Sequence, residues 1–128
     1  MNTTNLTLYP CPCCGYLVFN EAPGSYDICP ICFWEDDLSQ LRFVTLSGAN
    51  RPNLIEAQLN TVKYGIKVPG YKRRVESLTA YEREENWRLI DLTVDNLELS
   101  FVGNQGGTYP KDRTTLYYWR DTYWRRQP

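Results

Sequence analysis

Cys11-Pro12-Cys13-Cys14-Gly15-Tyr16 opens the stretch that decides this fold, and Cys29-Pro30-Ile31-Cys32 closes it. The stretch contains two C-x-x-C pairs, and fourteen residues separate Cys14 from Cys29. This is the spacing of a tetrahedral four-cysteine metal site, because each pair takes one edge of the metal while the interval folds as a hairpin. Gly15 can adopt a positive φ, so the backbone can turn back and point its amides at the sulfurs. The pattern predicts one structural zinc ion bound by Cys11, Cys14, Cys29 and Cys32.

Disulfides and iron are the alternatives to zinc. Residues 1–10 contain no basic segment followed by an apolar core, so we expect a cytoplasmic protein with reduced thiols. The two cysteine knuckles are similar to those of rubredoxin, which binds iron. However, the interval is shorter than in rubredoxin, and Phe33 stands where those proteins have a glycine. We therefore favour zinc. Cys13 belongs to neither C-x-x-C pair and is interpreted as a packed thiol.

A longer set of residues carries a family resemblance. The set comprises Tyr9 to Tyr16, Pro23 to Asp37, Gly48-Ala49-Asn50, Leu54 to Gln58, and Gly65. It resembles the bacterial cysteine-rich CPCC family over about residues 8–87. The resemblance implies a small zinc-ribbon-like domain, and, because some members lie beside toxin genes, a role as an immunity protein. The last forty residues lie outside the family pattern.

The composition suits a small folded protein. The chain has 128 residues, of which 42% are hydrophobic and 14% aromatic, which argues against disorder. We expect an α+β fold with two parts, a zinc-ribbon domain with a helix at 1–66 and a C-terminal α/β subdomain at 67–128. No apolar run is long enough to cross a membrane. Nothing in the sequence indicates the oligomeric state.

The net charge and the absence of histidine argue against two classes of function, non-specific nucleic-acid binding and catalysis. The formal charge is −1, and four thiolates with one zinc ion bring it to about −3, which argues against non-specific binding of nucleic acid. The chain has no histidine, so it lacks the usual activator of serine and cysteine nucleophiles. A four-cysteine zinc site also leaves no open position for water. The sequence therefore predicts a protein that is not an enzyme.

Local patterns predict the remaining elements. Asn53 with Glu56, and Thr79 with Glu82, have the spacing of helix-capping boxes, and Asp112 can also cap a helix. The expected elements are strands at 16–19, 26–28 and 41–46, helices at 54–64, 80–91 and 113–126, and strands on either side of Asp95-Asn96. The strands 16–19 and 26–28 should pair with each other between the knuckles, and Leu59 and Val62 should belong to the apolar face of the helix at 54–64.

Two surfaces are candidates for binding a partner. One is the acidic triplet Glu35, Asp36 and Asp37, which is expected at a solvated turn and can serve as an acidic handle for a basic surface. The other is the aromatic C-terminal helix with Tyr118, Trp119 and Trp124, although these rings can equally pack over the ribbon. The preferred hypothesis, which depends on the family resemblance, is an immunity protein that occludes the active site of a cognate toxin. A zinc-ribbon nucleic-acid binder and a rubredoxin-like electron carrier are the alternatives.

Overall fold

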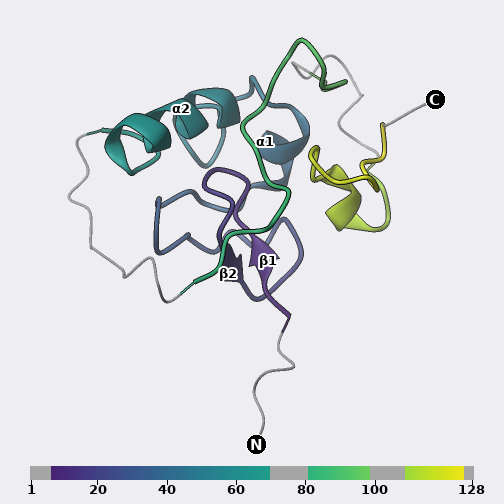
Figure 1. The fold of residues 1–128 in the computed structure, drawn as a ribbon, viewed down its shortest axis with the longest axis horizontal. Coiled ribbons are helices and arrows are strands. Elements are labelled where there is room, and N and C mark those ends of the chain that lie inside the picture. Colours follow the sequence, from purple (N-terminus) through teal and green to yellow (C-terminus); the bar gives the residue numbers. More distant parts are fainter. Residues whose placement is uncertain (1–6, 70–80, 99–108, 126–128) are drawn as a thin grey trace, which may run out of the picture.

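The fold is small and mixed, with short elements joined by long connections. The computed structural model describes residues 7–69, 81–98 and 109–125 (Figure 1). Its elements are the strands β1 (Tyr9–Pro10) and β2 (Leu17–Phe19), the helices α1 (Leu38–Arg42) and α2 (Leu54–Tyr64), and the 3-10 helix η4 (Arg113–Leu116). The expected mixture of helix and strand is confirmed in this form. Among the described residues, no helix is long and apolar enough to span a membrane.

The two strands flank the first cysteine pair. β1 and β2 are antiparallel, and Tyr9 lies opposite Phe19. The predicted pairing of residues 16–19 with residues 26–28 is therefore wrong. Ile28 instead forms a bridge with Glu35 across the second cysteine pair. The physical reason is that each knuckle reverses the chain by itself, so the residues that flank a knuckle are already next to each other and pair locally.

The strand predicted at 41–46 does not form: residues 41 and 42 end the short helix α1, Phe43 makes an isolated bridge with Glu98, and a turn follows. Asp37 caps α1 by accepting a hydrogen bond from the backbone N–H of Ser39, and the helix ends at Arg42. Gln40 and Leu41 are buried. The hydrogen bond to the Asp37 cap favours a helix here, because an N-cap stabilises even one turn of helix by satisfying its free N–H groups. The alternation of residues 41–46 was too loose a pattern to predict the structure correctly.

Helix α2 has the predicted bounds. Asn53 and Glu56 form the reciprocal capping box, and Gly65 ends the helix with φ 80°. The expected apolar face is only partly correct. Leu54 and Ala57 are buried, whereas the next apolar positions of the helix, Leu59 and Val62, are 56% and 68% exposed.

The segment 81–98 is irregular where a helix was expected at 80–91, with an isolated bridge between Arg83 and Tyr16. The Leu17 N–H donates to the Glu82 carbonyl at 2.7 Å, and the Glu84 N–H donates to the Gly15 carbonyl at 2.7 Å. In Figure 1 this green segment runs beside β2 and continues past α1 and α2. Pairing with the free edge of β2 uses the backbone groups that a helix would need. Thr79 and the strand expected after Asn96 lie largely outside the described residues.

The C-terminal segment also departs from the prediction. Asp112 does cap a helix, but η4 ends at Leu116 and does not continue towards residue 126. In a helix, three consecutive rings would point about 100° apart, so one face could not bury all of them. The irregular chain instead buries Tyr117, Tyr118 and Trp119 in the same cluster as the cysteines. The predicted α/β extension is not confirmed, and the division into 1–66 and 67–128 stays a prediction.

Candidate metal centre

The first knuckle is a tight turn closed by two backbone hydrogen bonds. The Cys11 N–H donates to the Tyr16 carbonyl at 2.9 Å, and the Gly15 N–H donates to the Cys11 carbonyl at 2.6 Å. Gly15 has φ 84°, a left-handed conformation that glycine adopts without a Cβ penalty. The turn places the side chains of Cys11 and Cys14 on one side.

The second knuckle repeats the same hydrogen bonds. The Cys29 N–H donates to the Trp34 carbonyl at 2.8 Å, and the Phe33 N–H donates to the Cys29 carbonyl at 3.0 Å. Phe33 takes the place of Gly15 and has φ 72°. A bulky residue thus occupies the left-handed position where rubredoxin-like knuckles have glycine. The equivalent turns present their cysteine pairs to each other.

The four predicted ligands come together. Their Sγ atoms all lie within 4.8 Å of one another, and all four residues are buried. The Cys11 and Cys32 sulfurs are 3.6 Å apart, and those of Cys14 and Cys29 are 3.7 Å apart. A tetrahedral site with metal–sulfur bonds of about 2.3 Å has sulfur–sulfur edges of about 3.8 Å. These two separations therefore match the edge of a tetrahedral thiolate site, and they are too long for disulfides.

The surroundings of the sulfurs favour a bound cation. Burial raises the pKa of the Cys11 and Cys32 thiols well above the usual range, because thiolates lose the solvation of water. Backbone N–H groups of Ile31 and Cys32 point at Cys29 Sγ, with N···S distances of 3.3 and 3.5 Å. These amides compensate part of one thiolate charge. A divalent cation would be needed to keep four thiolates together at neutral pH.

Aromatic side chains complete the burial of the site. Trp34 follows the second knuckle, is fully buried, and belongs to the same cluster as the four cysteines. Within the described part of the chain, its indole Nε1 has no hydrogen-bond partner. Tyr117 is also in this cluster, and burial raises the pKa of its hydroxyl far above the usual range. The site is therefore closed off from water on the side of these rings.

Cys13 is separate from the ligand set. Its side chain is 1% exposed, and its Sγ lies 3.2 Å from the Thr61 hydroxyl of α2. This agrees with its interpretation as a packed thiol.

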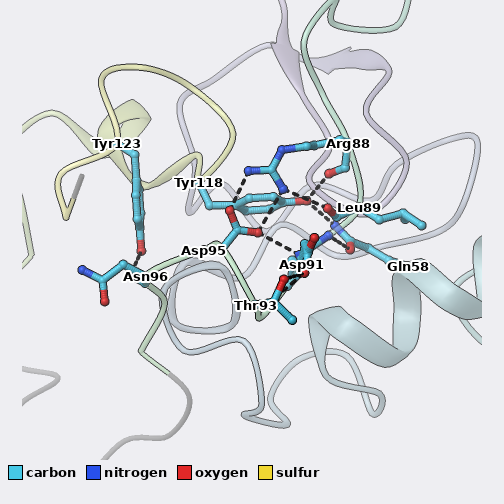
Figure 2. Close-up of polar contacts among 10 residues, drawn as sticks. Gln58, Arg88, Leu89, Asp91, Thr93, Asp95, Asn96, Tyr118 and Tyr123 are labelled. Atoms are coloured by element: carbon cyan, nitrogen blue, oxygen red, sulfur yellow. Dashed lines mark hydrogen bonds and ion pairs between the residues drawn. The ribbon is translucent and has the colours of Figure 1, made fainter. Parts of the chain in front are cut away.

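A buried polar connection between the first knuckle and the rest of the chain was not predicted. The Gln58 amide on α2 donates to the Pro12 carbonyl at 2.9 Å and to the Tyr118 hydroxyl at 2.8 Å. Its oxygen accepts the Ile90 N–H at 2.9 Å. The Tyr118 hydroxyl in turn donates to the Arg88 carbonyl, and Figure 2 shows Gln58, Tyr118 and Arg88 in this arrangement. No sequence signal identifies Gln58, because a glutamine in a helix is ordinarily a surface residue.

The acidic triplet is not a solvated handle. Asp36 is 3% exposed, and its carboxylate accepts hydrogen bonds from the Ser25 N–H and hydroxyl at 3.1 and 2.7 Å. Asp37 is 4% exposed, and besides capping α1 it accepts the Ala49 N–H at 2.9 Å. Glu35 is half-buried. The expectation of a solvated turn is wrong, since the two aspartates serve as acceptors for the chain's own donors.

The aromatic residues predicted to bind a partner are mostly internal. Tyr118 is 1% and Trp119 is 6% exposed, and the Trp119 indole donates to the Glu84 carboxylate. Trp124 is 36% exposed and stacks on the Arg42 guanidinium at 5.0 Å. The alternative that the rings pack over the ribbon is therefore correct for Tyr118 and Trp119, and Trp124 alone of the three has a substantial exposed surface.

The comparisons with known proteins agree with this geometry. The model of a family described as "Cysteine-rich CPCC" matches residues 9–82, which include both knuckles and α2. No curated protein matches the chain.

Proposed function

This chain belongs to the cysteine-rich CPCC family, and from that premise we propose that it is a non-enzymatic protein-binding module with one structural zinc ion on Cys11, Cys14, Cys29 and Cys32. The observation that carries the proposal is the cluster of four buried sulfurs that all lie within 4.8 Å of one another. Four thiolates satisfy zinc without further ligands, which is typical of a structural site.

Zinc is preferred to iron because zinc is the usual occupant of small closed four-cysteine sites, but the sulfur geometry suits both metals. Metal analysis of the purified protein should find about one equivalent of zinc and no visible absorption. A red protein with one equivalent of iron would refute the zinc assignment. The Cys11→Ser and Cys29→Ser variants should lose the metal, whereas Cys13→Ser should retain it, because Cys13 contacts Thr61 instead of the cluster.

The proposed zinc supports folding and leaves the binding to the protein surface. A structural zinc site contributes on the order of 10 kcal/mol, which is large beside the stability of a small domain. With four protein ligands the metal has no position for a water molecule or a substrate. The chain also has no histidine for proton transfer at neutral pH. These features support binding over catalysis.

The proposed partner is a cognate bacterial toxin, and the proposed activity is stoichiometric occlusion of its active site. This part is drawn from the family resemblance, and the exposed face of Trp124 supports it, because tryptophan is enriched at interface hot spots. The buried aspartates Asp36 and Asp37 cannot enter a toxin cleft without giving up their internal hydrogen bonds.

Calorimetric titration against the proposed cognate toxin, sought as the product of the gene next to that of this chain, tests this activity. A complex of fixed stoichiometry should form, and Trp124→Ala should weaken it by about 2 kcal/mol while the zinc content stays at one equivalent. Protection of cells at amounts far below those of the toxin would contradict occlusion. The Cys13→Ser variant changes a buried residue that contacts Thr61 of α2, so it serves as the control and should bind as the wild type does.

A further inference from the structure

Helix α2 displays an apolar stripe on its outer surface. Ile55, Leu59 and Val62 follow one another at intervals of four and three residues. At about 100° per residue, their side chains lie within about 60° of one another on the helix. Leu59 is 56% and Val62 is 68% exposed, and Ile55 is partly exposed. This 4-3 spacing is the one by which helices form a seam with another helix.

A second apolar surface continues the stripe at the N-terminal end of α2. A shallow groove of ≈ 810 Å³ joins Ile55 to Leu89, Leu92 and Val94 of the neighbouring segment. Leu92 is 50% and Val94 is 70% exposed. The stripe and the groove together form one apolar surface on two segments of the chain.

The turn that carries Leu92 and Val94 is held in place by polar contacts. The Asp91 N–H donates to the Asp95 carboxylate at 2.8 Å, and the Arg88 guanidinium pairs with the same carboxylate at 2.6 Å. Figure 2 shows Arg88, Asp91 and Asp95 in these contacts. The turn is therefore preorganised, and a partner that covers it does not have to order it first.

We propose that the partner covering this surface is a second copy of the chain, with its α2 antiparallel to the first across a two-fold axis at Leu59. The midpoint of Ile55 and Val62 lies half a residue before Leu59. A two-fold axis near Leu59 therefore places Ile55 against the partner's Val62, with an axial offset of one residue, about 1.5 Å at the helical rise. The partner's Val62 then reaches the groove beside Ile55.

The charges beside the stripe select this orientation. Glu56 and Lys63 are both exposed and lie seven residues apart, so they occupy the same flank of the seam. Their midpoint is half a residue after Leu59, so the same two-fold axis brings Glu56 opposite the partner's Lys63 in both halves of the interface. In a parallel pair this flank would face Gln58, which is buried and already bonded to Pro12. The antiparallel arrangement alone pairs the two charges.

Light scattering coupled to size-exclusion chromatography tests the proposal on the full-length metal-bound chain. At about 50 μM the wild type should elute with twice the 15.0 kDa mass of one chain. Leu59→Glu should raise the dissociation constant at least about 100-fold, because it sets two carboxylates against each other near the axis. Ile28→Glu is the matched control, since Ile28 is 59% exposed and lies on the second knuckle. This control should remain a dimer.

A charge exchange tests the orientation. Glu56→Lys and Lys63→Glu should each weaken self-association, because each creates like-charge pairs across the axis. An equimolar mixture of the two variants should form a heterodimer, in which all four charges are again matched. Glu56→Gln keeps an acceptor for the cap at Asn53 and controls for the loss of the capping box. A monomeric wild type, a dimeric Leu59→Glu with native metal content, or two variants that do not associate on mixing would each overturn the proposal.

Discussion

Replacing Gly15 by alanine should lower the free energy of unfolding for two separate reasons. The first reason is conformational, because Gly15 has φ 84° and an L-residue pays about 1–2 kcal/mol there. The second is steric. A Cβ on Gly15 would lie 2.5 Å from Cδ2 and 2.7 Å from Cγ of Trp87, far inside normal contact distance.

The Trp87 ring cannot easily move away. Its Nε1 donates to the Pro12 carbonyl at 3.0 Å, and the Arg83 guanidinium stacks on the ring at 5.1 Å from its centroid. Overpacking against a fixed group costs about 1–3 kcal/mol. The two effects together predict that Gly15→Ala lowers the free energy of unfolding by about 2–5 kcal/mol.

Gly24→Ala is the matched control for the conformational part. Gly24 also has a positive φ, 104°, but its Cβ would approach the flexible end of Arg113 at 2.9 Å. Its cost should therefore be about 1–2 kcal/mol, which is the backbone penalty alone. In a Trp87→Ala background, Gly15→Ala should fall to the same value, since the obstructing ring is gone.

Urea unfolding followed by circular dichroism, at a fixed excess of zinc, gives these free energies. The zinc concentration has to be equal in all samples, because metal binding contributes to the apparent stability. If Gly15→Ala and Gly24→Ala differ by less than about 0.5 kcal/mol, the contact with Trp87 carries no part of the effect. If Gly15→Ala is as stable as the wild type, the backbone argument for the knuckle is wrong.

Three further predictions concern the buried polar groups. Tyr118→Phe should cost about 1–3 kcal/mol in the same unfolding assay, because it removes the bond to the Arg88 carbonyl and one partner of the Gln58 amide; an unchanged stability would show that water replaces the hydroxyl. Burial holds the pKa of Asp36 above its usual range, so at pH values between the unfolded and the folded pKa the folded chain binds more protons than the unfolded chain. The contribution of this carboxyl to stability therefore falls as the pH rises from the unfolded pKa through the folded pKa. Asp36→Asn should therefore gain stability relative to the wild type between about pH 4 and pH 7, and a difference that does not vary with pH would contradict this. Burial alone would raise the pKa of Glu84, but its bonds from Arg120 and Trp119 outweigh this and hold the pKa below its usual range; the advantage of the wild type over Glu84→Gln should be full above about pH 5 and should shrink as pH falls below about 4.

The sequence predicted those features that depend on neighbours along the chain. The C-x-x-C spacing placed the two sulfurs of each pair on one turn, because a knuckle is a local turn whose geometry four or five residues determine. The capping box of Asn53 and Glu56 placed the start of α2, and Gly65 placed its end. In each case the decisive contacts lie within about one turn of chain, so the pattern is visible in the order of residues.

The errors arose where distant backbone segments compete for the same hydrogen bonds. Thr79 and Glu82 have the same spacing as a functioning capping box, but the Glu82 carbonyl accepts the Leu17 N–H of β2. A local pattern cannot indicate that a strand edge 65 residues earlier in the sequence will use that carbonyl. Similarly, the local pattern could not show that Tyr118 is buried, because its hydroxyl accepts a hydrogen bond from Gln58 of α2, 60 residues earlier in the sequence.

The Pro12 carbonyl shows how these distant segments support the metal centre. This carbonyl lies inside the first knuckle and accepts hydrogen bonds from Gln58 of α2 and from Trp87 of the segment 81–98. The cluster around the cysteines also contains Tyr117, Tyr118, Trp119 and Tyr123. Burial of an aromatic side chain contributes about 2–3 kcal/mol before the entropy cost, so four of them are comparable to the roughly 10 kcal/mol of a structural zinc ion. Residues beyond 66 therefore bury the knuckles, and the knuckles in turn provide the surface on which those residues pack. For this reason the metal and the C-terminal segment should stabilise the fold cooperatively.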